Sequence, residues 1–327
     1  MKRLICLLLS FMLIFTLIGC ENTEDDTITI LLDWTPNTNH TGIFAAEANG
    51  YFKEVGLNVE IVQPSEGGAT ALVASGKAQF CVSFQDSLAP AFAGEDVLPV
   101  TAVAAVVQHN TSGIVSRAGE GMDTPKGLEG KKYATWDMDV EKETIKDVMK
   151  KDGGNFDLVE LIPSTVTDEV SALQSKAVDA IWIFYGWAGI ACEVAGLDID
   201  YFEFADINPV FDYYTPVIIG NNDWLKENSE TAKAFLTALS KGYTYAAENP
   251  KEAADILMEA APELKSNSEL VYRSQEYLSK EYIADAKRWG EFDNERWASF
   301  FKWLNENNLL EDKIDPYYGF TNEYLPN

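Results

Sequence analysis

The sequence predicts an α/β protein with two lobes, each built on an open and mostly parallel β-sheet. Apolar strand-like runs alternate with helical patterns from Thr27 to about Gly220, as expected when helices connect parallel strands. One strand–helix–strand–helix order also occurs twice, with the second copy displaced by 99 residues. Beyond Asn221 the pattern changes to consecutive helices. Together these observations predict two similar lobes followed by C-terminal helices.

Matching dipeptides mark the repeat. Pro64-Ser65 precedes Lys77-Ala78 in the first copy, and Pro163-Ser164 precedes Lys176-Ala177 at the same spacing in the second. Each Lys-Ala pair leads into an apolar strand, and each strand leads through a polar or aromatic turn into a helix. The shared order predicts that the two lobes contain similar sheets.

The N-terminus has the pattern of an export and anchoring segment. Two basic residues precede an almost wholly apolar run, residues 4–18, which is typical of a secretory signal and too short for a spanning helix. The run ends in Leu-Ile-Gly-Cys, which resembles the lipobox of bacterial lipoproteins. We expect a signal peptide at 1–19, then a lipidated Cys20 and a charged tether at 20–26. The alternative is an ordinary secreted protein in which Cys20 is incidental.

Local pattern predicts the individual elements. Apolar and β-branched runs indicate strands, and apolar residues at helical spacing indicate helices. The strands are expected at 27–32, 58–63, 78–84, 98–107, 113–117, 131–136, 156–162 and 179–184. The helices are expected at 42–56, 68–76, 140–154, 168–177, 229–249, 250–261, 266–283 and 294–308.

The two lobes are expected to be joined by two chain crossings. The first lobe is predicted to comprise 27–115 plus 210–327 with the C-terminal helices, and the second to comprise 116–209. The chain would return to the first lobe at the apolar run 215–220. Ligands of open α/β sheets bind outside the carboxyl ends of the strands, so two facing lobes would share one cleft that closes about the hinge.

Charge and cysteine usage limit the function. The formal net charge is −27, and it becomes −29 once the two basic residues of the leader are removed. A chain this acidic does not bind nucleic acid through its phosphates. Cys6 is removed with the leader, so the mature chain keeps Cys81 and Cys192 in addition to Cys20. Both lie in apolar stretches and are expected to be buried thiols rather than a disulfide.

Sequence motifs of catalysis are absent. The two histidines, His40 and His109, lack the spacing of metal ligands, and no nucleophile elbow, phosphate-binding loop or dinucleotide-binding motif occurs. We therefore expect no catalytic residues, no metal and no cofactor. For His40, a hydrogen-bonding or helix-start role is favoured over that of a catalytic base.

Candidate binding residues lie on the turns that follow predicted strands. The stretch Asp33–His40 follows the first strand, and comparable turns contain Gln85 and Asp86, Trp136, and the segment 185–187. The aromatic residues on these turns could stack a planar ligand, as small heterocycles are often bound; they are Trp34, Trp136, Tyr185 and Trp187. The alternative for each ring is packing in a core or between lobes. That alternative is favoured for Trp182, Trp289, Trp297 and Trp303.

Glu193 is a further candidate because its neighbours along the chain are apolar. A carboxylate in such a setting could accept hydrogen bonds from an aminopyrimidine edge. The alternative, the polar face of an amphipathic helix, is equally compatible with the spacing.

Two motifs support a family resemblance. The stretch 31–61, with Asp-Trp-Thr-Pro-Asn-Thr-Asn-His, and the later Tyr-Gly-Trp-Ala-Gly-Ile-Ala-Cys-Glu resemble the thiamine pyrimidine-precursor binding proteins of bacterial ABC importers. These are related to sulfonate- and nitrate-type solute receptors and to eukaryotic pyrimidine-precursor synthases. The resemblance covers nearly the whole mature chain. It implies a two-lobed periplasmic-binding-protein fold of type II-like topology.

The resemblance also implies site residues. Trp34, Asn37, Asn39 and His40 match the first-lobe wall, Tyr185 and Trp187 the aromatic clamp, and Glu193 the carboxylate that faces the aminopyrimidine. With Gln85, Asp86 and Trp136 from the other turns, they form the predicted ligand site. The cysteine-rich run of the synthases is missing, which weighs against an enzyme.

The expected function is that of a monomeric lipoprotein on the outer face of the cell membrane. It would capture formylaminopyrimidine or hydroxymethylpyrimidine and deliver it to an ABC permease. The alternatives are a receptor of the same fold for another flat heterocycle such as riboflavin, or an enzyme like the pyrimidine-precursor synthases. A strongly anionic ligand is disfavoured, because Arg117 is the only arginine between Arg3 and Arg273.

Overall fold

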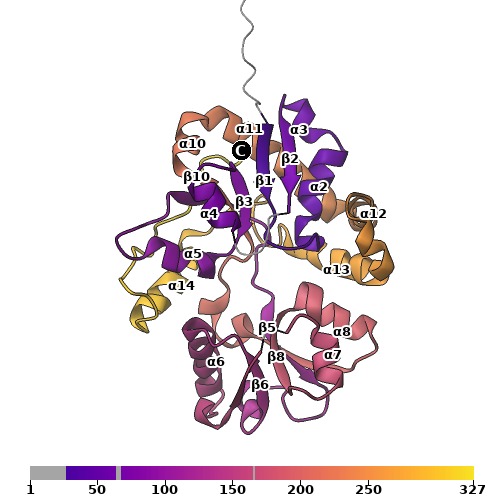
Figure 1. Ribbon diagram of the computed structural model, residues 1–327, viewed down its shortest axis with the longest axis vertical. Coiled ribbons are helices and arrows are strands. Elements are labelled where there is room, and N and C mark those ends of the chain that lie inside the picture. The colour runs from indigo at the N-terminus through magenta and orange to yellow at the C-terminus, as the bar shows by residue number, and fades with distance from the viewer. Residues whose placement is uncertain (1–26, 64–67, 165) are drawn as a thin grey trace, which may run out of the picture.

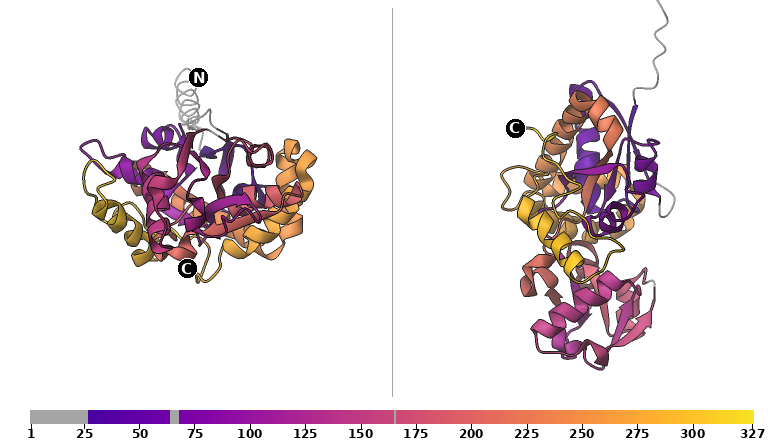
Figure 2. Two further views of the ribbon diagram at one scale, coloured as in Figure 1. Left: turned by 90° about the horizontal axis from the view of Figure 1, so that it is seen from below. Right: turned by 90° about the vertical axis from the view of Figure 1, so that its left-hand side faces the viewer.

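The computed structural model describes residues 27–63, 68–164 and 166–327. The predicted signal peptide, the tether with Cys20, and the Pro64-Ser65 pair lie outside the described residues. Within them the chain forms two α/β lobes that follow one another along the longest axis of the molecule (Figure 1; Figure 2, right). No helix among the described residues combines the length and the apolar character needed to cross a bilayer. The predicted two-lobed α/β fold is confirmed.

The first lobe contains a five-stranded sheet in the order β2-β1-β3-β10-β4 among the described residues. Strand β1 pairs in parallel with β2 and β3, whereas β10 is antiparallel to both β3 and β4. The bounds are β1 Thr27–Leu31, β2 Asn58–Val62, β3 Phe80–Ser83, β4 Val100–Ala105 and β10 Val217–Asn221.

The second lobe repeats this plan, again within the described part of the chain, with the order β7-β6-β8-β5-β9. Strand β6 is parallel to β7 and β8, and β5 is antiparallel to β8 and β9. The bounds are β5 Ser112–Arg117, β6 Lys132–Thr135, β7 Glu160–Pro163, β8 Ala180–Phe184 and β9 Ile199–Glu203. Strand β9 was not among the predicted strands.

The antiparallel strand of each sheet is the one that enters directly from the other lobe. The chain crosses once between β4 and β5 and once between β9 and β10. The predicted boundary between residues 115 and 116 falls inside β5, although all of β5 lies in the second sheet. The first crossing therefore precedes Ser112. The apolar run at 215–220 overlaps β10, which lies in the first sheet.

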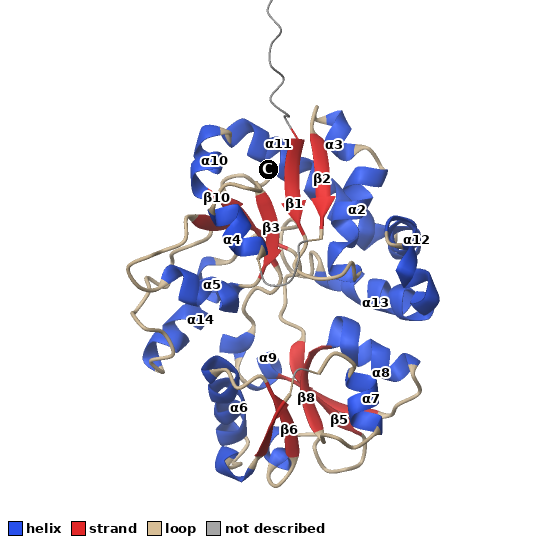
Figure 3. Cartoon of the chain, in the orientation of Figure 1, coloured by secondary structure: helices blue, strands red, loops and turns tan. Residues whose placement is uncertain are grey.

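Helices cover both sheets (Figure 3). Those of the first lobe are η1 Thr38–His40, α2 Thr41–Ala48, α3 Tyr51–Glu54, α4 Ala69–Ala74, α5 Gln85–Phe92, α10 Asn222–Glu227, α11 Ser229–Glu248, α12 Pro250–Ala260, η6 Pro262–Asn267, α13 Ser268–Glu281 and α14 Asn294–Glu306. Those between the crossings are η2 Pro125–Leu128, α6 Asp139–Lys151, η3 Phe156–Leu158, α7 Glu169–Gln174, η4 Tyr185–Gly189, α8 Ile190–Val194, α9 Phe204–Ile207 and η5 Pro209–Phe211.

The predicted helix 42–56 is divided into α2 and α3. Gly50 lies between them with a φ of 74°, a left-handed conformation that glycine adopts without steric cost. Helix α2 then packs closely on α11. A Cβ atom added at Gly242 of α11 would lie 2.1 Å from the carbonyl oxygen of Gly42. The two glycines thus permit a backbone approach that any side chain would prevent.

The repeat is present in the structure, but at a different offset. Phe80 pairs with β1 at Ile30, and Ala180 pairs with β6 at Tyr133, so equivalent strand positions are 100 residues apart. Gly76 and Lys176, with φ values of 74° and 58°, end α4 and α7 in the same way. The two Lys-Ala pairs, 99 residues apart, are therefore one residue out of structural register.

The core follows the sequence prediction for the tryptophans and cysteines singled out as buried. Trp182, Trp289, Trp297 and Trp303 are buried, as are the free thiols Cys81 and Cys192. Ring contacts continue from Phe204 through Phe211 to Trp303 of α14, with centroid distances of 6.3 and 5.0 Å. The apolar core thus runs from the second lobe to the C-terminal helices beside the crossings.

Candidate ligand-binding site

Both lobes present the carboxyl ends of their parallel strands at the crossings. Ser112, at the start of β5, pairs with Phe184 at the end of β8. Val217, at the start of β10, pairs with Ser83 at the end of β3. Because β5 and β10 both begin just after a crossing, the ends of β8 and β3 lie next to the hinge. The turns that follow these strands are where the sequence placed the candidate site.

Large apolar side chains are exposed on these turns. Of the eight such side chains among the described residues, four follow or end a strand at its carboxyl end: Trp34 (55% exposed), Trp136 (45%), Met138 (56%) and Phe184 (38%). The rings of Trp136 and the buried Trp182 are 5.8 Å apart. These four side chains are therefore candidates for contact with a ligand. Met138 and Phe184 were not predicted.

The first-lobe loop is held by its own hydrogen bonds. The Asn37 side chain accepts from the amide of Asn39 at 2.9 Å and donates to the Thr35 carbonyl at 3.1 Å. His40 Nδ1 accepts from the Asn37 amide at 3.2 Å, so its Nε2 carries the hydrogen and donates to Asp33 at 2.6 Å. The Asn39 carbonyl accepts from the Tyr243 hydroxyl at 2.7 Å.

These bonds give Asn37 and His40 a structural role in forming the loop. His40 is fully buried, and both of its ring nitrogens are used within the protein. The half-buried Asn39 and the exposed Trp34 are the residues of this wall that remain accessible. Contact of any of them with a ligand stays a prediction.

Gln85 and Asp86 begin α5 directly after β3. Gln85 is fully buried; it donates to the Trp297 carbonyl at 2.8 Å and accepts from the Tyr214 amide at 2.9 Å. It therefore joins α5 to α14 and to the second crossing. The Oδ1 atom of Asp86 is buried without a hydrogen-bond partner, and burial raises the pKa of this carboxyl to about 6. An unpaired acceptor at a strand end is suited to a ligand N–H group.

The predicted clamp residues lie at a junction between the lobes. The Tyr185 hydroxyl donates to the Glu193 carboxylate, which also receives a hydrogen bond from Arg273 of α13. Burial, and then this contact with Glu193, raises the pKa of Tyr185 to about 12. Trp187 packs against the apolar cluster of α12, η6 and α13 in the first lobe. The alternative stated for Trp187, packing between lobes, matches this position.

The segment η4 is a π-helix, a form that is rare and frequent at functional sites. Both of its glycines lie close to neighbouring side chains. A Cβ atom at Gly189 would lie 2.5 Å from the ring of Tyr185, and one at Gly186 would lie 2.8 Å from Leu278 of α13. The sequence signal for this turn is therefore the pair of glycines around Trp187.

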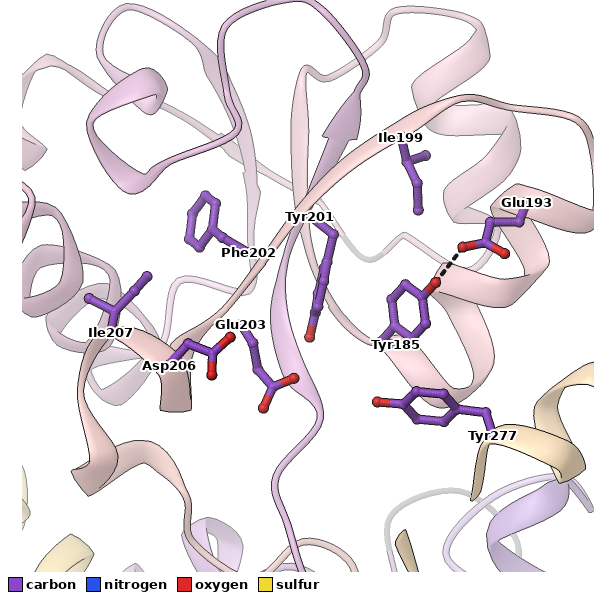
Figure 4. Close-up of a pocket in the computed structure, with 9 residues that line it drawn as sticks. All are labelled: Tyr185, Glu193, Ile199, Tyr201, Phe202, Glu203, Asp206, Ile207 and Tyr277. Atoms are coloured by element: carbon purple, nitrogen blue, oxygen red, sulfur yellow. Dashed lines mark hydrogen bonds between the residues drawn. The ribbon is translucent and has the colours of Figure 1, made fainter. Parts of the chain in front are cut away.

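A cavity of about 540 Å³ adjoins this junction (Figure 4). The rings of Tyr185, Tyr201 and Tyr277 line it together with the carboxylates of Glu193 and Glu203. Centroid distances of 5.0 and 5.3 Å separate Tyr185 from Tyr201 and from Tyr277. Tyr277 comes from α13, so both lobes contribute to the lining. Tyr201 and Tyr277 were not predicted, because β9 was missed and the helix at 266–283 was not connected with the ligand site.

A second cavity, of about 350 Å³, shares Glu203, Asp206 and Tyr277 with the first and reaches the crossings. There His109 of the first crossing lies 2.9 Å from Asp212 of the second. The hydrogen bond to Asp212 raises the pKa of His109. Burial and the neighbouring carboxylates raise the pKa of Glu203 to about 7. Within the described residues, no group of side chains is arranged to hold a metal ion.

Arg117 has no part in this region. Its guanidinium is buried within the second lobe, where it pairs with Glu120 and Asp179 and donates to the carbonyls of Leu173 and Val178. The arginine nearest the predicted clamp is Arg273, and its charge is opposed by Glu193. An anionic ligand would therefore meet no uncompensated arginine at these positions.

Comparisons with known proteins agree with this architecture. A family model described as "NMT1/THI5 like" matches residues 37–253. A formylaminopyrimidine-binding protein of Halalkalibacterium halodurans is 29% identical over 95% of this chain and 96% of its own length. A 4-amino-5-hydroxymethyl-2-methylpyrimidine phosphate synthase of Saccharomyces cerevisiae is 27% identical, with 76% of this chain and 74% of the synthase covered.

Among solved structures, the periplasmic aliphatic sulphonate binding protein SsuA from Escherichia coli superposes with a TM-score of 0.68. The two chains are 14% identical, and the match covers 89% of this chain and 96% of the other. At this identity the likeness concerns the fold alone. It confirms the periplasmic-binding-protein architecture that the sequence predicted.

Proposed function

Because the chain belongs to the NMT1/THI5-like family, we propose that it is a solute receptor of an ABC importer. Its ligand would be a thiamine-related aminopyrimidine, either formylaminopyrimidine or hydroxymethylpyrimidine, and the protein would deliver it to a permease. The relative from Halalkalibacterium halodurans, named for binding formylaminopyrimidine, supports this ligand.

The observation that carries the proposal is the set of exposed rings at the strand ends. Trp34 belongs to the first lobe, and Trp136 and Phe184 to the second, so a flat ligand between the lobes could be stacked from both sides. Each such ring contact contributes about 0.5–1.5 kcal/mol beyond the apolar area that it buries.

Carboxylates complete the proposed recognition. An aminopyrimidine presents an exocyclic amine beside a ring nitrogen. A carboxyl group with a pKa of about 6, as at Asp86, can accept from the amine and share a proton with the ring nitrogen. Glu193 can serve in the same way only if the ligand replaces Arg273 or Tyr185 as its partner. Asp86 is therefore the stronger candidate of the two.

We further propose that the mature chain is anchored to the outer face of the cell membrane through lipidated Cys20, and that it acts as a monomer. The lipobox-like end of the leader supports the anchor. Replacement Cys20→Ser should move the protein from the membrane fraction to the medium or periplasm. Retention of the Cys20→Ser variant in the membrane fraction would refute the lipid anchor.

A thermal-shift panel tests the ligand assignment. Formylaminopyrimidine, hydroxymethylpyrimidine, thiamine, riboflavin and taurine would each be added at the same concentration. A ligand at a hundredfold excess over its Kd stabilises the folded state by about 2.7 kcal/mol, which raises the unfolding temperature by several degrees. A shift with riboflavin alone would favour the flavin alternative, and no shift with either pyrimidine would eliminate the proposed ligand.

A further inference from the structure

The two lobes also meet away from the crossings, along helix α13. Ser274 of α13 is fully buried, and its hydroxyl oxygen lies 2.5 Å from the hydroxyl oxygen of Thr38. The same Ser274 hydroxyl contacts the carbonyl oxygen of Gly186. Thr38 belongs to the loop after β1, and Gly186 to the π-helix after β8. One side chain thus joins the two loops that the sequence identified as opposite walls of the ligand site.

The donors and acceptors of this link have one consistent assignment. A carbonyl oxygen can only accept, so the single hydroxyl hydrogen of Ser274 points to Gly186. The Thr38 hydroxyl must then donate to Ser274. The Thr38 carbonyl in turn accepts from the Tyr282 hydroxyl at 2.6 Å. Removal of Ser274 would leave the Gly186 carbonyl and the Thr38 hydroxyl without these partners in a buried setting, which is costly.

Side chains of both lobes pack around the link. A Cβ atom at Gly186 would lie 2.8 Å from Leu278, and Trp187 packs on the apolar cluster of the first lobe. The ring of Tyr277 lies 5.3 Å from that of Tyr185. At the exposed rim, Arg273 forms an ion pair with Glu193. Apolar contact inside and an ion pair at the rim are features of a stable interface.

We propose that α13 keeps this contact in the ligand-free protein and forms a third connection between the lobes, with Ser274 as the positioning residue that sets the spacing of the two ligand walls. Figure 1 shows α13 and α8 on one side of the molecule, and α14 and α6 on the other. The loop after β1 and the π-helix after β8 would then keep the spacing that Ser274 sets when the lobes open.

Hydrogen exchange of the ligand-free full chain tests the contact without any ligand. We expect the amides of 185–194 to be protected in the unmodified protein. Ser274→Ala should speed their exchange at least tenfold, and Ser279→Ala, at a partly exposed serine on the same helix, should not. If Ser274→Ala fails to fold, Arg273→Gln removes only the ion pair at the rim and should speed exchange at 190–194. Fast exchange of 185–194 in the unmodified protein would overturn the proposal.

The positioning role is tested with formylaminopyrimidine as the probe, and this arm rests on the proposed function. Ser274→Ala should weaken its binding at least fivefold, while Ser279→Ala leaves it unchanged. Equal affinity of both variants would overturn the positioning role. If the unmodified protein binds no pyrimidine, the proposed function fails, whereas the exchange experiment still decides whether α13 joins the lobes.

Discussion

Asp86 combines a buried, unpaired carboxylate oxygen with a position directly after β3. Desolvation disfavours its charged form, and backbone N–H groups at the start of α5 offset only part of this effect. The carboxyl is therefore destabilising to the ligand-free fold once it is ionised. Groups that bind ligands are often unfavourable for the stability of the empty site, so Asp86 is a natural point of contact.

We predict that Asp86→Asn stabilises the ligand-free protein near pH 7.5 and weakens pyrimidine binding. Because the folded pKa is raised from 3.8 to about 6, the carboxyl is best tolerated below pH 4, and stability is lost as the pH rises through about 6. The stabilisation by Asn should approach roughly 1–3 kcal/mol above pH 7 and vanish below pH 4. Chemical denaturation at several pH values measures it, with Asp123→Asn as an exposed control. A destabilised Asp86→Asn variant at pH 7.5 would count against this account.

The exposed rings give a second prediction. Trp34→Ala and Trp136→Ala should each weaken pyrimidine binding about threefold to tenfold, because each removes a stacking contact. Trp34→Ala should not lower the free energy of unfolding by more than about 0.5 kcal/mol, since its side chain is 55% exposed. Trp136→Ala should lower it by more, because the Trp136 ring is 45% exposed and packs beside Trp182. Titration calorimetry and denaturation measure the two effects. Leu158→Ala, which removes another exposed apolar side chain of the second lobe, is the control, and the same loss of affinity there would exclude a specific role for the rings.

Single residues were predicted unevenly by the sequence. Burial of Trp182, Trp289, Trp297 and Trp303 followed from spacing, since periodic apolar positions report a core directly. The sequence could not show whether His40 forms hydrogen bonds within its own loop or to a ligand. Its partners Asp33 and Asn37 are themselves polar residues of that loop. Nothing in the local pattern placed Ser274 or Arg273 beside the clamp, because that contact depends on how α13 is docked.

Helix α11 depends on glycine for its approach to α2. We predict that Gly242→Ala destabilises the protein by about 2–4 kcal/mol, because its Cβ would lie 2.1 Å from the backbone oxygen of Gly42 and the two helices would have to separate. The helix propensity of alanine offsets only about 1 kcal/mol of this loss. Denaturant unfolding measures the change, with Ser240→Ala on the same helix as the control. A Gly242→Ala variant as stable as the parent would show that the helices can separate at little cost.

Strands and helices with a regular apolar pattern were predicted from the sequence, whereas elements whose geometry depends on tertiary contacts were not. The strands β1, β3, β6 and β8 appeared as apolar runs bounded by turn residues. Strand β9 was missed because its residues Ile199–Glu203 include two carboxylates and are mostly half-buried at a sheet edge. The π-helix η4 was taken for a turn, since its geometry is set by the close contacts of Gly186 and Gly189.

An ionisable pair of side chains links the two chain crossings between the lobes. His109 of the first crossing and Asp212 of the second are hydrogen-bonded, and Asp285, Arg296, Glu203 and Glu281 surround them. Because the folded pKa of His109 is raised above 6.5, its stabilising effect is fully present below pH 6.5 and is lost as the pH rises through the folded value. Glu203, with a pKa raised to about 7, acts in the same direction.

We therefore predict that the ligand-free protein is more stable at pH 6 than at pH 8.5. The variant His109→Gln should flatten this dependence, whereas Lys77→Gln, a change outside the hinge, should leave it intact. Thermal unfolding across this pH range measures the effect. An unaltered pH profile in His109→Gln would assign the dependence to other groups.

The sequence was most informative about the architecture of the whole molecule. Its alternation of strands and helices and its internal repeat strongly constrain the topology. It predicted the two-lobed α/β fold. The predicted offset of the repeat was wrong by one residue. The two Lys-Ala pairs are identical in sequence, but they do not occupy equivalent positions of the two sheets. The third contact between the lobes, through α13, was not foreseen, since it needs the full tertiary arrangement.

Calorimetric titration of the purified protein with formylaminopyrimidine measures the proposed binding itself. We expect saturable binding of one molecule per chain with a Kd in the micromolar range or below, and weaker binding by Trp34→Ala and Asp86→Asn. Absence of heat with both formylaminopyrimidine and hydroxymethylpyrimidine, at protein concentrations where a folded and monomeric state has been verified, would contradict it.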